Sequence, residues 1–167
     1  MKRALLLALT FVLFFSTPVA ANNKKVYENH QYQFHMTFPA TWQIRESKYA
    51  VFEADAPGAN LTIAVFLAPS NGAPVNYKVS FTKRDEEKLL QALPAFEVID
   101  KRHVNIANYD ALQVLLFSDK RYNINYLFTI KDYYVLIVAL GRINNFVQEQ
   151  QTIDQIASTL TFLNGNK

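Results

Sequence analysis

Residues 122–140 read YNINYLFTIKDYYVLIVAL and decide the fold class of this chain. Apolar and mostly polar residues alternate over the first half, which is typical of a strand with one buried face. Residues 133–140 are aromatic or aliphatic at every position, as in a central strand that is covered on both sides. The short polar pair Lys131-Asp132 joins the two halves, so we expect an antiparallel hairpin. The alternating apolar set consists of Tyr122, Ile124, Tyr126, Phe128 and Ile130.

Further strands are expected on both sides of this hairpin. Strand-like runs at residues 96–106 and 111–117 come directly before it, and their short polar links extend it into an antiparallel meander. Residues 32–38 alternate between apolar and polar positions and stop at Pro39, which has no N–H to donate to a sheet. The other N-terminal strands are expected at residues 26–27, 51–52 and 61–67.

Two helices are expected to cover this sheet, one before the meander and one after it. The first begins at Ser80 or Thr82 and ends at Pro94. The second begins at Asn145, with Gln148 placed three residues later for a capping box. The sequence therefore predicts the α+β class, with an antiparallel β-sheet flanked by helices on both faces as an α/β/α sandwich. The apolar stripe of the second helix consists of Phe146, Ile153, Ile156, Ala157 and Leu160.

Residues 1–21 have the three-part build of a secretory signal peptide. Two cations, Lys2 and Arg3, precede an apolar run, and small residues lead up to Ala21. The apolar run is too short for a membrane-spanning helix, so we expect cleavage after Ala21 rather than a permanent anchor. Residues 22–167 then form a single domain, periplasmic or secreted and not membrane-spanning.

The composition excludes other classes of protein. The chain has 17 Lys and Arg residues against 14 Asp and Glu residues, and two of the cations leave with the signal peptide. The nearly neutral remainder lacks the clustered positive charge that nucleic acids attract, so no nucleic-acid partner is expected. Cysteine is absent, which leaves an exported chain without disulfides and without the acylated cysteine of a lipoprotein.

The residues that carry reactive groups form no recognisable catalytic or metal-binding set. His30, His35 and His103 carry side chains that can bind metal ions, but their spacing is not that of helical metal ligands, and no metal or cofactor is assigned. Ser80 and Lys83 match the Ser-x-x-Lys pattern of penicillin-recognising enzymes, yet the Lys-Thr-Gly element is missing and a helix cap explains the serine. We therefore expect no enzyme. A cation site at the histidines and a hydrolase at Ser80 stay open as alternatives.

The run Phe34-x-Met36-x-Phe38-Pro39-x-x-Trp42 resembles the opening of the PsbP/Mog-like fold family, in which an apolar strand ends in an aromatic-Pro-x-x-Trp turn. The hairpin at residues 106–111 and the closing segment at residues 153–162 are also similar to that family. The resemblance implies an α/β/α sandwich around an antiparallel sheet. It also implies docking on larger partners without enzymatic activity, because members include a photosystem II subunit, a nuclear Ran-binding protein and DcrB-type envelope proteins.

These observations predict a soluble, monomeric, non-enzymatic domain that docks on a membrane-associated or periplasmic protein of the cell envelope. The expected contact surfaces are the loop at residues 69–79 and the exposed face of the N-terminal strands. Two alternatives stay open. One is an extrinsic photosystem II subunit with a calcium-linked role, and the other is a binder of a small ligand or cation in a cleft lined by tyrosines and histidines. The candidate contact residues of the loop are Asn71, Gly72, Pro74, Asn76 and Tyr77.

Overall fold

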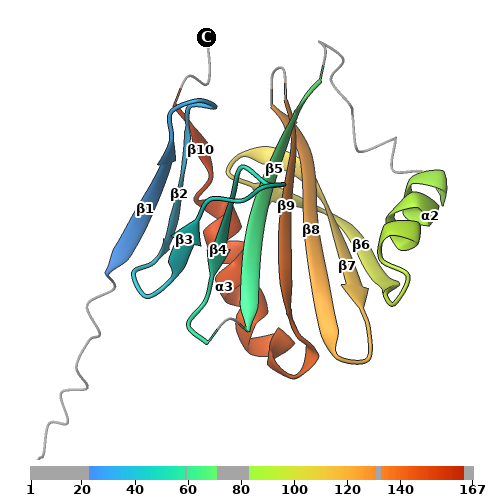
Figure 1. Ribbon diagram of the computed structural model, residues 1–167. Helices are drawn as coiled ribbons and strands as arrows, with labels where there is room; N and C mark the ends of the chain where they lie inside the picture. Colours follow the sequence, from blue (N-terminus) through green and yellow to red (C-terminus); the bar gives the residue numbers. More distant parts are fainter. Residues whose placement is uncertain (1–22, 59, 71–82, 131–132, 164–167) are drawn as a thin grey trace, which may run out of the picture.

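The computed structural model describes residues 23–58, 60–70, 83–130 and 133–163. These residues form antiparallel sheets and two α-helices, which confirms the α+β class (Figure 1). A 3-stranded sheet has the order β1-β2-β10, and a 7-stranded sheet has the order β3-β4-β5-β9-β8-β7-β6. The helices are α2 (Lys83–Ala92) and α3 (Phe146–Ser158), and the strands are β1 (Lys24–Asn29), β2 (Phe34–Pro39), β3 (Gln43–Arg45), β4 (Phe52–Asp55), β5 (Leu61–Pro69), β6 (Glu97–Ile106), β7 (Tyr109–Phe117), β8 (Arg121–Ile130), β9 (Tyr133–Arg142) and β10 (Thr161–Phe162).

The predicted meander is confirmed by the order of the last four long strands. Strands β6, β7, β8 and β9 follow one another as antiparallel neighbours, and β9 lies between β5 and β8. The apolar run at residues 133–140 therefore occupies the central position that its composition indicates. The single sheet expected from the sequence is wrong, however, because β2 pairs with β1 and β10 instead of continuing into β3.

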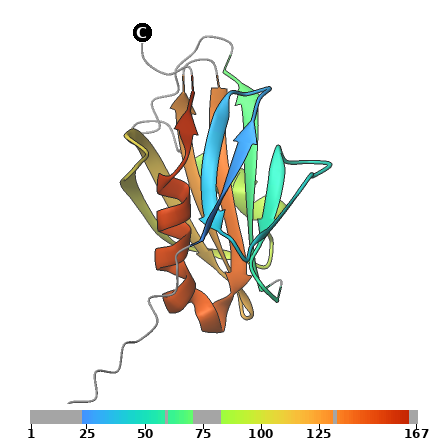
Figure 2. The ribbon, with the colours of Figure 1, turned by 90° about the vertical axis from the view of Figure 1, so that its left-hand side faces the viewer.

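One face of the seven-stranded sheet is covered by α3 and the three-stranded sheet together (Figure 2). Alternate residues of the central strands point to this face and form one buried cluster with residues of β2 and α3. The predicted stripe of the last helix is largely confirmed, since Ile153, Ile156, Ala157 and Leu160 are buried there and Phe146 packs against the cluster. Burial of this continuous apolar layer is the main source of stability.

Phe52 on β4 joins the two sheets through its ring contacts. The centroid of its ring lies 4.1 Å from that of Tyr27 on β1, and 6.3 Å and 5.8 Å from those of Phe34 and Phe38 on β2. Trp42 follows in the turn after β2 and is only 5% exposed, with its ring centroid 5.8 Å from that of Phe38. The aromatic-Pro-x-x-Trp segment thus fixes the start of the seven-stranded sheet against the three-stranded one.

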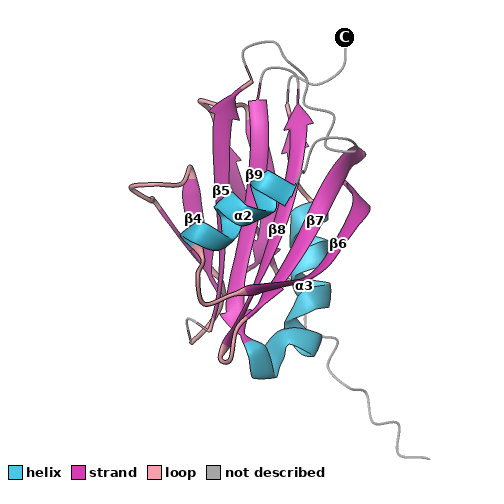
Figure 3. Cartoon of the chain, turned by 90° about the vertical axis from the view of Figure 1, so that its right-hand side faces the viewer, coloured by secondary structure: helices cyan, strands magenta, loops and turns pink. Residues whose placement is uncertain are grey.

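The opposite face of the seven-stranded sheet is covered less evenly. Leu90 of α2 and Leu93, which directly follows the helix, pack against a separate cluster on β7, and Figure 3 shows α2 on this side of the sheet. The β9 residues on the same face are only half-buried, so the expectation that this strand is fully covered on both sides is wrong. The β7 residues of the cluster are Leu112, Val114 and Leu116, and the half-buried β9 residues are Leu136, Val138 and Leu140.

The start of α3 differs in detail from the capping box expected at Asn145. Asn145 ends a short 3-10 helix, η1 (Ile143–Asn145), and directly precedes the first α-helical residue, but its side chain makes no capping hydrogen bond to the helix backbone. Its amide instead donates to Oε1 of Glu149 at 3.2 Å. The capping box with Gln148 is therefore wrong, because the asparagine side chain is engaged by a carboxylate one helical turn further on.

Several sequence predictions lie outside the described residues. These are the signal peptide at residues 1–21, the cleavage after Ala21, and the loop residues Asn71, Gly72, Pro74, Asn76 and Tyr77. Within the described part of the chain, no helix has the length and apolar character needed to cross a membrane.

Candidate functional site

Four polar side chains gather on one face of the sheet at β3, β4 and β5. Arg45 lies directly opposite Glu53 in the β3–β4 pairing, and Asp55 lies opposite Thr62 in the β4–β5 pairing. Directly opposed residues of an antiparallel pair point to the same face, and residues two apart on a strand share it. The pleat therefore brings these side chains together. We call Arg45, Glu53, Asp55 and Thr62, with Ser47 of the following loop, the edge cluster.

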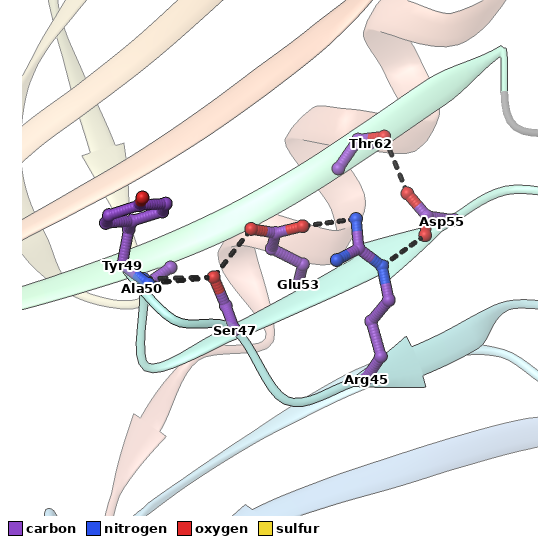
Figure 4. Close-up of polar contacts among 7 residues, drawn as sticks. All are labelled: Arg45, Ser47, Tyr49, Ala50, Glu53, Asp55 and Thr62. Carbon is purple, nitrogen blue, oxygen red and sulfur yellow. Dashed lines mark hydrogen bonds and ion pairs between the residues drawn. The ribbon is translucent and has the colours of Figure 1, made fainter.

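Arg45 binds both carboxylates of the edge cluster (Figure 4). Its Nε donates to Oδ2 of Asp55 at 2.8 Å, and its Nη2 pairs with Oε2 of Glu53. Thr62 completes the arrangement by donating from Oγ1 to Oδ1 of Asp55 at 2.6 Å. The planar guanidinium thus holds two strands in a fixed relation through charge-assisted hydrogen bonds.

The electrostatics of the edge cluster keep both partners charged. Burial disfavours the ionised form of Asp55, but hydrogen bonds from Arg45 and Thr62 and the charge of Arg45 outweigh it, so the pKa of Asp55 lies below its ordinary value. The hydrogen bond to Asp55 likewise raises the pKa of Arg45. Arg45 and Asp55 therefore form an ion pair in which both groups stay charged near neutral pH.

Ser47 connects the edge cluster to the loop between β3 and β4. Its hydroxyl donates to Oε1 of Glu53 at 2.6 Å and accepts from the backbone N–H groups of Tyr49 and Ala50 at 3.2 Å and 3.1 Å. The serine therefore fixes the turn, as Figure 4 shows. A nucleophilic role for this serine has no support, since its hydroxyl proton is directed at a carboxylate that is already paired with Arg45.

The loop at residues 46–51 presents an aromatic ring to solvent. Tyr49 is 81% exposed, and the Nζ of Lys48 lies 5.5 Å from the centroid of its ring. An exposed tyrosine on a turn that is already ordered is a typical anchor for protein binding, because little conformational entropy is lost when it docks. The edge cluster and this loop are our candidate functional site.

A different polar network ties α3 to the covered face of the sheet. The hydroxyl of Tyr122 donates to Oε2 of Glu149 at 2.5 Å, and that of Tyr126 donates to Oδ1 of Asp154. Gln113 reaches the same Asp154 oxygen at 3.4 Å. Burial, followed by these hydrogen bonds to carboxylates, raises the pKa of both tyrosines. Both tyrosines are fully buried, so they belong to the core and do not line the open ligand cleft considered from the sequence.

The structure places the three histidines on different elements. His30 lies in the turn after β1, His35 is half-buried on β2, and His103 is on β6 with its Nδ1 3.6 Å from Oδ1 of Asp110. In the described ranges, no three or more His, Asp or Glu side chains are grouped so that they could hold a metal ion. Lys83 is the first residue of α2 and is exposed, whereas Ser80 lies outside the described residues, so the Ser-x-x-Lys alternative stays untested.

The edge cluster is the part of the candidate site that the sequence analysis missed. A signal for it was present, because Glu53 and Asp55 alternate with Phe52 and Ala54 and so place two carboxylates on the outer face of one strand. Two negative charges at neighbouring positions of one face repel each other, so they indicate that a cation from an adjacent strand lies between them. The exposed Tyr49 carried no comparable signal, because aromatic residues in this chain are mostly buried.

Comparisons with known proteins place the fold. No protein-family model matches the sequence, and no curated protein matches it either. The structure is similar to the PsbP protein CyanoP of Synechocystis sp. PCC 6803, with a TM-score of 0.65 and 12% identity over 87% of this chain and 95% of that chain.

Two further solved structures are similar to this chain over most of its length. The Ran-binding protein Mog1p of Saccharomyces cerevisiae gives a TM-score of 0.59 with 10% identity over 86% of this chain and 97% of that chain. LpqN of Mycobacterium tuberculosis, which is involved in cell envelope biogenesis, gives a TM-score of 0.60 with 16% identity over 83% of this chain and 90% of that chain. The chain therefore has the PsbP/Mog-like fold, as the sequence resemblance implies.

Proposed function

We propose that the chain is an exported, non-enzymatic domain that docks on a protein of the cell envelope through the edge cluster and the loop at residues 46–51. The observation that carries this proposal is the 81% exposure of Tyr49 on a loop that Ser47 holds in place. The charged Nζ of Lys48 lies 5.5 Å from the centroid of this ring, and an aromatic anchor beside a polar rim is the usual composition of an interface. This surface belongs to the N-terminal strands, where the sequence analysis expected contacts.

Proteins with the same fold support a docking role by analogy. Mog1p is a Ran-binding protein, and LpqN is involved in cell envelope biogenesis. A shared fold does not transfer a partner, so the partner of this chain has to be identified directly. The photosystem II alternative, with its calcium-linked role, remains a prediction from the resemblance.

Export and the complete sandwich are parts of the same proposal. Residues 1–21 act as a cleavable signal peptide, which delivers the domain to the periplasm or the exterior. The helix α2 serves as the second cover of the sheet and completes an α/β/α arrangement of one domain. N-terminal sequencing of the protein recovered from the periplasm tests export directly, and we expect Asn22 as the first residue. A start at Met1 in a cytoplasmic fraction would contradict it.

Photocrosslinking in intact cells tests the docking site. A benzophenone amino acid in place of Tyr49 should give a discrete crosslinked species whose partner is identified by mass spectrometry. Val147 on α3 is the matched control position, because it is 85% exposed and lies outside the proposed site. Equal crosslinking from both positions, or none from position 49, would contradict the proposal.

A small-ligand role has one observation in its favour. A groove of about 700 Å³ lies between β2 and α3, and polar side chains line much of it. Among them are Lys24 and Thr37 from the first two strands and Gln151, Thr152 and Gln155 from the helix. A thermal-shift panel of metabolites, calcium and zinc distinguishes this role from docking, since a ligand at 100 times its dissociation constant adds about 2.7 kcal/mol of stability.

A further inference from the structure

Strands β1 and β3 are the neighbouring ends of the two sheets. Strand β1 ends the three-stranded sheet and β3 ends the seven-stranded sheet, so in the described residues each has a strand partner on one side. Figure 2 shows β1 on the side of its sheet that is next to β3 and β4. No backbone hydrogen bond joins β1 to β3 among these residues. Within the described part of the chain, each of these strands therefore has one edge whose backbone groups have no strand partner.

The two edge strands run in the same direction. Strand β1 is antiparallel to β2, and the turn in which the N–H of Trp42 donates to the carbonyl of Pro39 at 3.0 Å reverses the chain again into β3. A strand placed between β1 and β3 would then be antiparallel to both. This is the pairing found throughout both sheets, so one added strand would join them without changing their pattern.

A groove occupies this position. It has a volume of about 300 Å³ and is lined by Lys25–Glu28 of β1, by residues 44–46 at the end of β3, and by Phe52. Because successive side chains of a strand point to opposite faces, a run of consecutive residues can line a groove only along the strand's backbone edge. The rings of Tyr27 and Phe52, whose centroids are 4.1 Å apart, form its apolar floor.

The charged side chains that line the groove differ between its two ends. Lys25 and Tyr27 lie opposite the buried Phe38 and Met36, so both are on the core side of β1. Ile44 of β3 packs against the core, and Glu46, which directly follows β3, also lines the groove. The groove thus has a cation at the end where β1 begins and a carboxylate at the end where β3 finishes, with apolar groups between.

The other edge strand of the seven-stranded sheet, β6, has a different distribution of charged and apolar residues. Strand β6 carries the consecutive residues Asp100, Lys101, Arg102 and His103, which is the type of charged edge that prevents strand addition. Strand β1 also carries charges at Lys24, Lys25 and Glu28, but they flank an apolar centre formed by Val26, which is 53% exposed, and the half-buried Tyr27.

We propose that the groove between β1 and β3 binds an extended segment of the partner protein, which inserts as a strand antiparallel to both and unites the two sheets. The segment has a basic residue near its N-terminal end to face Glu46, an apolar residue at the centre to face Tyr27 and Phe52, and an acidic residue near its C-terminal end to face Lys25. This inference deepens the proposed docking function and rests on it, since Arg45 of the edge cluster also lines the groove. Main-chain pairing supplies affinity, and the three side chains supply specificity.

The test uses a seven-residue probe, acetyl-Thr-Lys-Thr-Val-Thr-Glu-Thr-amide, and the same peptide with its Lys and Glu exchanged. Both are titrated to millimolar concentration into the protein while backbone amide signals and hydrogen exchange are followed by NMR. We expect the first probe to bind about 10-fold more tightly than the second and to slow exchange at amides of β1 and β3. The double variant Lys25→Glu/Glu46→Lys should reverse this preference. Glu87→Lys/Lys88→Glu on α2 is the matched control and should leave it unchanged.

Backbone methylation of the probe separates insertion from simple edge addition. The N–H groups of an inserted strand point alternately to its two neighbours, so N-methylation of either alternate set should abolish binding. If N-methylation of only one of the two alternate sets abolishes binding, the proposal is overturned, because the peptide then pairs with a single edge. The proposal is also overturned by an absence of shifts at millimolar probe, or by shifts confined to other elements. Protection of β1 that rises with protein concentration without the probe would assign the groove to a second copy instead. Crosslinking from position 49 in cells is independent of these results and still reports on docking itself.

Discussion

The covered face of the seven-stranded sheet and its β3–β4 edge use the same kinds of polar bond in different surroundings. On the covered face, the hydroxyls of the fully buried Tyr122 and Tyr126 donate to carboxylates of α3. At the edge, Arg45 and Thr62 donate to carboxylates of β4, but the Arg45 side chain is 53% exposed. Water can replace the partners at the edge and much less readily on the covered face.

This difference separates stability from recognition. Breaking a buried hydrogen bond leaves an unsatisfied polar group, whereas breaking an exposed ion pair costs little. The exposed network still orders the loop that carries the exposed Tyr49, which is the surface we propose for docking. The covered face should therefore be sensitive to substitution in folding, and the edge should be sensitive in binding.

Phe52→Ala should cause the largest loss of stability, because Phe52 lies where the seven-stranded sheet packs against the three-stranded sheet. Its ring contacts Tyr27, Phe34 and Phe38, so truncation leaves a cavity between the sheets. We expect the free energy of unfolding to fall by about 3–5 kcal/mol, measured by urea denaturation. Val147→Ala, at an 85% exposed position, is the control and should change it by less than about 0.5 kcal/mol. A Phe52→Ala loss below about 1 kcal/mol would show that the sheets are held together elsewhere.

Gly141→Ala tests the covered face by overpacking instead of by a cavity. Gly141 lies opposite Tyr122 in the β8–β9 pairing, and a methyl group there would overlap the tyrosine ring. The ring has to move, which also disturbs its hydrogen bond to Glu149. We expect a loss of about 1–3 kcal/mol in the same denaturation experiment. The pair Gly141→Ala and Tyr122→Phe should be non-additive, since both act on one ring; simple additivity would refute the proposed cause.

Tyr126→Phe removes the hydrogen bond from a fully buried tyrosine to the half-buried Asp154 and should cost about 1–3 kcal/mol, because among the described residues Asp154 keeps only the long contact from Gln113 as a side-chain donor. Burial and the bond to Asp154 raise the pKa of Tyr126 above the ordinary tyrosine value of about 10. Above pH 10 the unfolded chain therefore loses the proton of Tyr126 while the folded chain keeps it. Stability falls as the pH rises through this range, and the fall should be shallower in Tyr126→Phe. Equal slopes in denaturation series from pH 8 to about pH 11 would contradict this assignment.

The periodic features of the fold were predictable from the sequence. Burial of Phe34, Met36 and Phe38 and the apolar stripe of α3 depend on spacing along one segment, which the sequence displays directly. The division into two sheets was not predictable in this way. It depends on Phe52 meeting rings from β1 and β2, which are contacts between separate strands.

The candidate site was harder to predict from the sequence than the fold, and the reasons are again physical. The alternation of Glu53 and Asp55 indicates a charged outer face, but the identity of Arg45 as their partner depends on strand register. The turn at Ser47 needs a hydroxyl that contacts its own backbone and a distant carboxylate together. The capping prediction at Asn145 failed similarly, because Glu149 competes for the side chain.

Tyr49→Ala should have the smallest effect on stability and the clearest effect on binding. The ring is 81% exposed, so the free energy of unfolding should change by less than about 0.5 kcal/mol. Affinity for the crosslinked partner should fall by roughly 10-fold or more, because an aromatic anchor is lost. Ser47→Ala provides the sharper comparison: it keeps the ring but removes the hydrogen bonds to the N–H groups of Tyr49 and Ala50, so binding should weaken while the contacting group stays in place. If Ser47→Ala binds as tightly as the unaltered protein while Tyr49→Ala does not, the ring acts without the ordered loop. The edge cluster would then support the strands and play no part in recognition.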